Sequence, residues 1–286
     1  MSDYVIMTDT GCDIEFETLR EWGVGFRGLT FHFEDGVEHP EGGMSKSDFY
    51  ARMRAGEVSK TSAVNSQTFK ELFEEALKDG KDVLYLGFSS GISATSNSAM
   101  MAANELSEEY PDRKIITIDT LAASAGQGLI IYYAVEKKKA GADIEENAQY
   151  VRDMLPHLAH WFTVEDLVYL KRGGRVSAAA AFAGGVLGIK PVLHVDDEGH
   201  LINMQKVRGR DQSLRMIAKK YAETAQDKKG IYYISHGDCL EDAKKLESMI
   251  ESEGGGKCAM FAEIGMIIGS HAGPGTIALF FLASGR

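Results

Sequence analysis

The sequence predicts an α/β fold, with an N-terminal Rossmann-like domain on a mostly parallel sheet and a C-terminal α+β domain. In the first half, short apolar strand-like runs alternate with helix-like runs, which is the order of a parallel sheet covered on both faces. From about residue 160 onward, a hairpin pattern is mixed with helices instead. The 286 residues, 44% of them hydrophobic, can form two cores. We place the domains at residues 1–159 and 160–286.

The strands expected in the first domain are short apolar runs bounded by glycine or polar turns. They lie at residues 5–7, 24–33, 83–86 and 115–118. The expected helices repeat apolar residues at helical spacing, and one of them begins at a capping serine, Ser45. They lie at residues 16–22, 69–77 and 99–110, and from Ser45 and Ser124 onward. A further helix is expected at 143–158, stopped or bent at Pro156, and an acidic loop at 34–41.

In the second domain, residues 190–195 and 201–207 predict a hairpin across the polar turn 196–199. Helices are expected at 211–225 and 240–253, with a strand at 231–234 between them. Two apolar segments flanked by glycine, 264–268 and 276–283, are too short for a membrane span and indicate core. No linker rich in proline, serine or charge separates the halves, so we expect them to pack tightly.

The composition excludes several classes of function. A formal net charge of −11 argues against a nucleic-acid partner, which selects a basic surface. The start of the chain lacks a signal peptide and no apolar run reaches about 18 residues, so we expect no integral membrane association. The 3 cysteines are far apart and form no ligand-spaced pair, which favours a cytoplasmic protein without a metal site. No phosphate-loop motif is present, and we expect no cofactor.

Hydroxyl side chains gather where predicted strands end and helices begin. After the apolar run at 83–86, the chain passes through Gly87 and Gly91 into a series of serines and threonines that includes Ser93. Thr61 and Ser62 begin a second such series. Backbone N–H groups at a helix start and neighbouring hydroxyls can together bind a phosphate or carboxylate. In parallel sheets ligands bind beyond the carboxyl ends of the strands, where these groups and Asp9 and Ser124 are expected. An ordinary serine-capped helix is the competing interpretation.

A serine hydrolase is the alternative function. Gly87-Phe88-Ser89-Ser90-Gly91 matches the G-x-S-x-G nucleophile motif and follows a strand. Ser89 would then be the nucleophile, with Asp119 and His271 available as its acid and its base. Two features favour the binding interpretation instead. The helix is expected to begin nearer Ser93, and no HGGG-type oxyanion segment precedes the motif.

The histidines and a basic turn offer further candidates. His157 and His160 have the i, i+3 spacing of a helix face, but no set of carboxylates completes a metal site, so they are expected to be surface or boundary residues. His271 lies between two glycines and is either a ligand-contacting residue or a hydrogen-bonded turn residue. The bases around Gly173 and Gly174 form either a solvated turn or a site for an acidic group. The small-residue run at 178–188 and the 12 methionines suit core filling or a lipid tunnel.

Several motifs, in their order and spacing, resemble the DegV family of bacterial fatty-acid-binding proteins along nearly the whole chain. They are Thr8-Asp9-Thr10, Thr61-Ser62, Ser89-Ser90-Gly91-Ile92-Ser93, LVYLKRGGRVS at 167–177, Ile189-Lys190-Pro191 and IGSHAGPG at 268–275. The chain departs from the common family pattern at Val64-Asn65 and at Ala94-Thr95-Ser96.

The resemblance implies a lipid-binding protein rather than an enzyme, with a long-chain fatty acid such as palmitate in a tunnel between two domains. It implies that the hydroxyls of Thr61, Ser62 and Ser93 hold the carboxylate, with Arg172 and His271 near it. It further implies roles in lipid transport and phospholipid metabolism. Some members present the bound acid to a fatty acid kinase, which forms an acyl phosphate for phospholipid synthesis.

Overall fold

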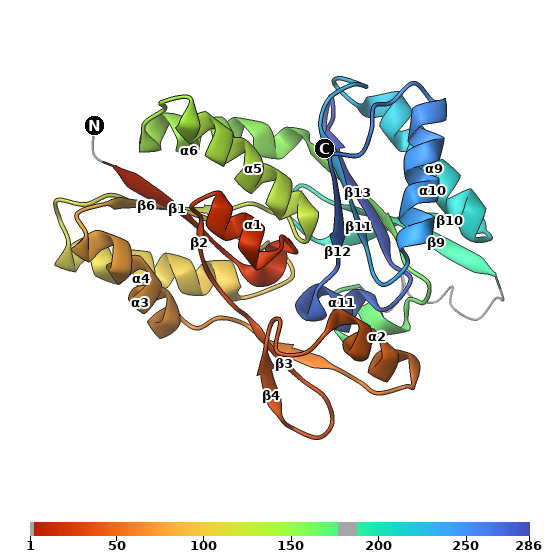
Figure 1. Cartoon of the computed structure of the whole chain (residues 1–286), viewed down its shortest axis with the longest axis horizontal. Helices are drawn as coiled ribbons and strands as arrows, with labels where there is room; N and C mark the ends of the chain where they lie inside the picture. Colours follow the sequence, from red (N-terminus) through yellow and green to blue (C-terminus); the bar gives the residue numbers. More distant parts are fainter. Residues whose placement is uncertain (1–2, 177–187) are drawn as a thin grey trace.

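Three β-sheets organise the computed structural model, which describes residues 3–176 and 188–286 (Figure 1). The first is a parallel sheet of four strands in the order β2-β1-β6-β7. These strands are β2 (Gly25–Arg27), β1 (Tyr4–Asp9), β6 (Asp82–Gly87) and β7 (Ile115–Asp119). All six residues of β6 are buried, as expected for a central strand of a parallel sheet covered on both faces.

Helices cover both faces of this sheet. Val83 and Tyr85 of β6 pack in one core with α3 (Ser66–Lys78) and α4 (Thr95–Glu109). Leu84 and Leu86, which point to the opposite face, pack in another core with α5 (Ala125–Lys139) and α6 (Ile144–Met154). The predicted Rossmann-like arrangement of the N-terminal half is therefore confirmed.

The second sheet has six strands in the order β10-β9-β8-β13-β11-β12, antiparallel except between β11 and β12. These strands are β8 (Leu158–Thr163), β9 (Ile189–Val195), β10 (Leu201–Arg208), β11 (Tyr232–His236), β12 (Met260–Glu263) and β13 (Ile277–Leu282). Helices α9 (Arg210–Thr224) and α10 (Leu240–Ser252) cover one face, and α5 lies toward the other (Figure 1). This mixed sheet with its helices confirms the predicted α+β half.

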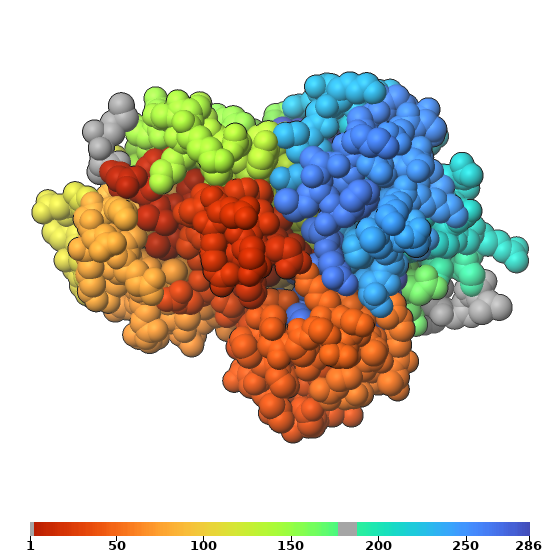
Figure 2. Space-filling model, viewed as in Figure 1, coloured from red at the N-terminus to blue at the C-terminus, as the bar shows by residue number. Residues whose placement is uncertain are grey.

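The third sheet is small and was not expected. Its strands run in the order β4-β3-β5, at Glu38–Pro40, Thr30–His32 and Lys60–Ser62. With α2 (Lys46–Arg54) it forms a lobe that projects from the two larger parts, coloured orange in Figure 2. The lobe packs on α11 (Met266–Ala272) from the far end of the chain. The remaining elements are η1 (Thr10–Cys12), α1 (Phe16–Glu21), η2 (Leu155–His157) and α7 (Val168–Arg172).

Three local predictions were wrong. The single strand expected at 24–33 is two short strands in different sheets, and the acidic loop contains β4. The helix expected at 143–158, stopped or bent at Pro156, is α6 followed by the 3-10 turn η2, which contains Pro156. The strand β8 then begins at Leu158, because the residues from there on pair with β9 and β13. His160 is therefore a strand residue, 1% exposed, rather than a surface or boundary histidine. The proposed domain boundary at 159/160 falls inside β8.

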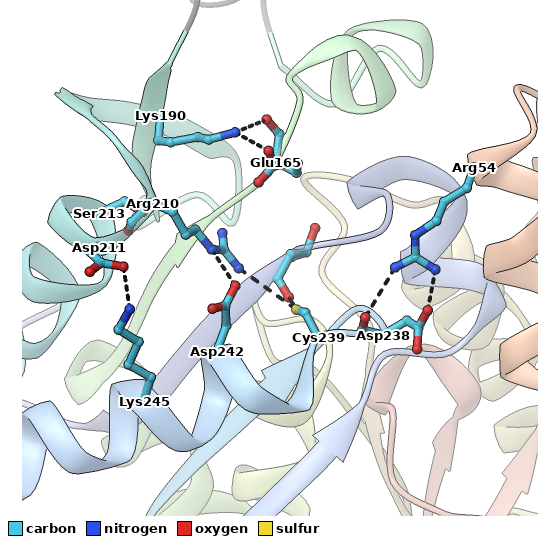
Figure 3. Close-up of polar contacts among 11 residues, drawn as sticks. Arg54, Glu165, Lys190, Arg210, Asp211, Ser213, Asp238, Cys239, Asp242 and Lys245 are labelled. Atoms are coloured by element: carbon cyan, nitrogen blue, oxygen red, sulfur yellow. Dashed lines mark hydrogen bonds and ion pairs between the residues drawn. The ribbon is translucent and has the colours of Figure 1, made fainter.

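Ion pairs join the lobe to the second half and the helices to one another (Figure 3). Arg54 of α2 pairs with Asp238 in the loop after β11. Arg210 Nε lies 2.8 Å from Asp242 Oδ2, which links α9 to α10. Such partly exposed pairs contribute little stability each, so they orient the parts more than they hold them.

Among residues 3–176 and 188–286, none of the helices has the length and the apolar character that a membrane span needs. The same residues contain no cluster of three or more histidine, cysteine and acidic side chains that could hold a metal ion.

Candidate functional site

A cavity of about 230 Å³ lies between the two halves. That is many times the roughly 10–15 Å³ that a single water needs. Both halves contribute to its wall, which is mostly apolar. The apolar side chains include Phe88, Ile92, Phe162, Val195, Ile267 and Phe280. A few polar side chains interrupt this wall, namely Thr61, Ser93, Ser124, His160, Arg175, His271 and Thr276. A concave, largely apolar space with few polar groups suits a ligand with a long hydrocarbon part.

Thr61 and His271 meet at one end of this cavity. Thr61 lies in the middle of β5, and His271 lies in the last turn of α11. Thr61 Oγ1 is 2.8 Å from His271 Nε2. Burial lowers the pKa of His271 to about 4, with the nearby Arg175 acting in the same direction. The imidazole is therefore neutral at neutral pH and can exchange one hydrogen bond with the threonine hydroxyl.

Two acidic residues of the N-terminal half hold the start of α11. The Glu41 carboxylate accepts from the backbone N–H groups of Met266 and Ile267, both at 2.9 Å. Asp13 Oδ1 accepts from Gly265 N at 2.9 Å. Burial raises the pKa of Asp13 to about 6 and that of Glu41 to about 7. These contacts satisfy helix N–H groups that have no internal partner, and thus fix the helix that carries His271. The sequence showed no helix here, because glycines interrupt its apolar pattern.

Ser93 enters the cavity from the loop before α4. Its Oγ lies 2.9 Å from Thr95 Oγ1, and its backbone N–H donates to Ser89 O at 3.1 Å. The glycine loop and the hydroxyl series predicted after β6 are therefore present, and they bring Ser93 into the same cavity as Thr61 and His271.

Arg175 supplies the positively charged side chain at the end of the cavity where Thr61 and His271 meet. Its Nε donates to Ile92 O at 3.1 Å, and burial lowers its pKa. Arg175 also borders an outer hollow of about 430 Å³. Thr61 and His271 line both the cavity and this hollow. The polar end of the cavity therefore lies next to the protein surface.

The structure brings together some of the predicted site residues and not others. Thr61, Ser93 and His271 line the cavity, as does Ser124. Ser62, the next residue on β5, is exposed, because successive strand residues point to opposite faces. It lies outside the cavity lining. Arg172 is exposed on α7 and borders only the outer hollow.

The arginine at the cavity is Arg175, three residues further along the predicted motif. Sequence reasoning missed it, although both bases belong to the same Gly-Gly turn. Asp9 also lies outside the cavity lining. Its carboxylate accepts from Tyr85 Oη at 2.6 Å and from Phe88 N at 3.0 Å, which ties β1 to the end of β6. The small-residue run at 178–187 lies outside the described residues.

The hydrolase alternative is not supported. Ser89 is fully buried, and its Oγ donates to Gly199 O at 2.9 Å. The Asp119 carboxylate accepts from the backbone N–H of Leu121 at 3.0 Å, and His271 is paired with Thr61. Neither Asp119 nor His271 hydrogen-bonds to the Ser89 hydroxyl, so these three described residues form no triad.

Comparison with known proteins gives one consistent answer. Residues 3–284 match the family model described as "Uncharacterised protein, DegV family". A DegV domain-containing protein of Clostridium perfringens is 40% identical over 285 residues, which cover 99% of this chain and 98% of that protein. A DegV domain-containing protein of Streptococcus pyogenes is 33% identical over 281 residues, 98% of each chain.

Solved structures share the fold over the whole chain. A fatty-acid-binding DegV family protein of Thermus thermophilus has a TM-score of 0.89 at 28% identity, covering 99% of this chain and 100% of that one. DegV of Bacillus subtilis, described as a fatty acid binding protein, has a TM-score of 0.85 at 25% identity, with coverage of 99% and 100%. A stearic acid-binding protein of Eubacterium ventriosum has a TM-score of 0.86 at 26% identity, with 98% of each chain covered.

Proposed function

The chain belongs to the DegV family, and from this premise we propose that it binds a long-chain fatty acid in the cavity between its two halves. One observation supports the proposal most. A largely apolar cavity ends at a cluster of hydrogen-bonding side chains, formed by Thr61, Ser93, Arg175 and His271. Solved relatives that are described as fatty-acid-binding proteins have the same fold. The protein acts as a carrier rather than an enzyme.

The carboxylate of the fatty acid binds at the polar end in this proposal. A buried carboxylate is costly unless charge-assisted hydrogen bonds replace its water. The hydroxyls of Thr61 and Ser93 can donate to it, and the Arg175 guanidinium adds a positive charge at the same end. When Thr61 donates to the carboxylate, its oxygen can accept from His271 Nε2, 2.8 Å away. His271 then orients the threonine hydroxyl toward the ligand.

The hydrocarbon chain lies along the apolar wall toward Phe162 and Phe280. Burial of apolar surface contributes about 0.8 kcal/mol per methylene. A chain of about sixteen carbons, such as palmitate, gains on the order of 10 kcal/mol before the costs of ordering and association are subtracted. The net free energy of binding is accordingly much smaller.

Presentation to a fatty acid kinase is the further part of this proposal. Arg172 is exposed beside the outer hollow, which shares Thr61 and His271 with the cavity. A kinase docked there could reach the carboxylate and form an acyl phosphate, which would place the protein in lipid transport and phospholipid metabolism. The same proposal places the protein in the cytoplasm, where its three free cysteines would remain reduced.

Mass spectrometry of the purified protein tests the binding proposal. Organic extraction is expected to release a long-chain fatty acid in near-stoichiometric amount, and delipidated protein is expected to bind added palmitate or oleate. A preparation that carries no fatty acid and binds neither would refute the proposal. Serum albumin serves as the positive control for extraction and rebinding.

A further inference from the structure

His160 places a buried, unpaired polar group in the wall at the apolar part of the cavity. It lies on β8, is 1% exposed, and lines the cavity beside Phe162 and Phe280. Its buried Nε2 has no hydrogen-bond partner among the described residues. Buried polar atoms are paired in most proteins, because an unpaired one loses the hydrogen bonds that water gave it. A group of this kind in a ligand cavity calls for a partner on the ligand.

A neighbouring arginine, Arg286, shows whether His160 Nε2 is a hydrogen-bond donor or acceptor, and therefore which kind of ligand atom can pair with it. Arg286 Nη2 lies 3.3 Å from His160 Nδ1. A guanidinium only donates hydrogen bonds, so Nδ1 is the acceptor in this contact. Burial, with the charge of Arg286, holds the pKa of His160 well below its usual range, so the ring is neutral. A neutral imidazole whose Nδ1 accepts carries its proton on Nε2. The unpaired group is therefore an N–H donor.

The position of His160 separates it from the carboxylate end. Thr276 Oγ1 donates to the carbonyls of Ala272 and Gly273, which places Thr276 at the end of α11, next to His271. From there β13 runs along the cavity through Ala278 to Phe280, which pairs with His160. Four residues of antiparallel strand span about 13 Å. His160 thus lies beside the middle or the tail of a bound chain.

We propose that His160 is a second polar subsite, which selects fatty acids whose chain carries a hydroxyl or oxo oxygen toward its middle or tail. The inference rests on the proposed function, because the carboxylate must bind at the Thr61 end. The oxygen accepts from His160 Nε2–H and thereby pairs a donor that has no other partner among the described residues. The T-shaped ring of Phe280, 5.7 Å away between centroids, is only a weak acceptor in its place.

A competition series tests this subsite. The probes are stearic acid and hydroxystearic acids whose hydroxyl lies at successive carbons from the middle of the chain to its methyl end. The wild type is expected to bind one or two neighbouring isomers roughly tenfold more tightly than stearic acid, as one new hydrogen bond to a buried donor allows. His160→Phe keeps an aromatic ring and removes the donor. It is expected to abolish this preference and to bind stearic acid at least as well.

His236→Phe is the matched control. His236 is also a buried histidine with an unpaired ring nitrogen in the same sheet, but it lies outside the cavity lining. This variant is expected to keep the preference for the hydroxylated isomer. If no isomer outcompetes stearic acid, or if the preference survives in His160→Phe, the subsite is refuted and the proposed function stands. If stearic acid itself does not bind, the proposed function fails, and the subsite with it.

A measurement on the wild type covers the case in which His160→Phe does not fold. In protein labelled with ¹⁵N at histidine, the preferred hydroxystearic acid is expected to shift the Nε2 resonance of His160 well beyond the shift that stearic acid causes. Equal shifts with the two acids would refute the hydrogen bond.

Discussion

The hydroxyl of Thr61 lies 2.8 Å from Nε2 of His271, although 210 residues separate the two in the chain. One residue belongs to the small lobe on the N-terminal half, and the other to the C-terminal half. Their contact forms part of the polar end of a largely apolar cavity. It also depends on contacts made elsewhere, since Glu41 and Asp13 hold the start of the helix that carries His271. Ligand binding and the packing of the two halves are therefore linked at this point.

Replacing Thr61 by valine keeps the shape of the side chain and removes its hydroxyl. We expect Thr61→Val to weaken palmitate binding by roughly tenfold to a hundredfold, because a hydrogen bond to a charged group contributes about 1.5–3 kcal/mol. Ser62→Ala is the control, since Ser62 is exposed on the other face of β5. It is expected to change the affinity by less than about twofold. Equal losses in both variants, measured by titration calorimetry, would contradict this assignment.

The two arginines of the Gly-Gly turn are expected to differ in lipid binding. Arg175 lines the cavity and Arg172 does not. Arg175→Ala should lose roughly tenfold or more in palmitate affinity, because the carboxylate loses its nearest positive charge. Arg172→Ala should bind palmitate as the wild type does. Thermal unfolding of both variants checks that the lost contact between Arg175 and Ile92 has not unfolded the protein. The opposite ranking of affinities would contradict the assignment.

The kinase proposal predicts a second difference for Arg172. In an assay with the cognate fatty acid kinase, Arg172→Ala loaded with palmitate is expected to lose most acyl-phosphate formation, although it still carries the lipid. The exposed side chain beside the outer hollow would then contribute to docking rather than to binding. Unchanged turnover in this variant would argue against a docking role for Arg172.

The lowered pKa of His271 makes the free energy of unfolding depend on pH. Its pKa falls from the usual 6.5 to about 4 on folding, so between these values the unfolded chain binds a proton that the folded chain does not. Stability therefore rises with pH across this window and is lost as the pH falls through it. In urea unfolding at several pH values, the free energy of unfolding is expected to fall less on acidification in His271→Gln than in the wild type. The difference should be on the order of 1–2 kcal/mol near pH 5. Parallel curves for the two proteins would contradict the lowered pKa.

Ala278 tests the course of the hydrocarbon chain. It lies on β13 opposite Phe162 and lines the cavity. Ala278→Phe fills part of the cavity, so affinity is expected to fall for palmitate and stearate while shorter fatty acids still bind. Ala278→Val, the graded control, should shift the length preference less. A uniform loss at every chain length would show that the chain does not pass this residue.

Some of the fold could be predicted because its signals are local. The apolar run at 83–86 lies between helices on both faces and forms β6. The capping residue Ser45 accepts from the backbone of the following helix, as its sequence context predicts. The glycine loop after β6 is another local signal, and it places Ser93 at the cavity. In each case the information lies within a few residues of the element.

Other features depend on partners far away in the chain. His160 belongs to an apolar segment that also suits a helix, and only pairing with β9 and β13 makes it a strand. Residues 24–33 divide at Gly28 and Leu29, because one part joins β1 and the other joins β5. Arg172 and Arg175 have the same charge and nearly the same context, so the sequence could not show which one faces the cavity.

A crystal structure of the protein with palmitate tests the central claim most directly. We expect the carboxylate within hydrogen-bond distance of Thr61 Oγ1 and Ser93 Oγ, near Arg175, with the chain running past Phe162 toward Phe280 and His160. A carboxylate bound at the opposite end, or palmitate bound outside the cavity altogether, would contradict the account.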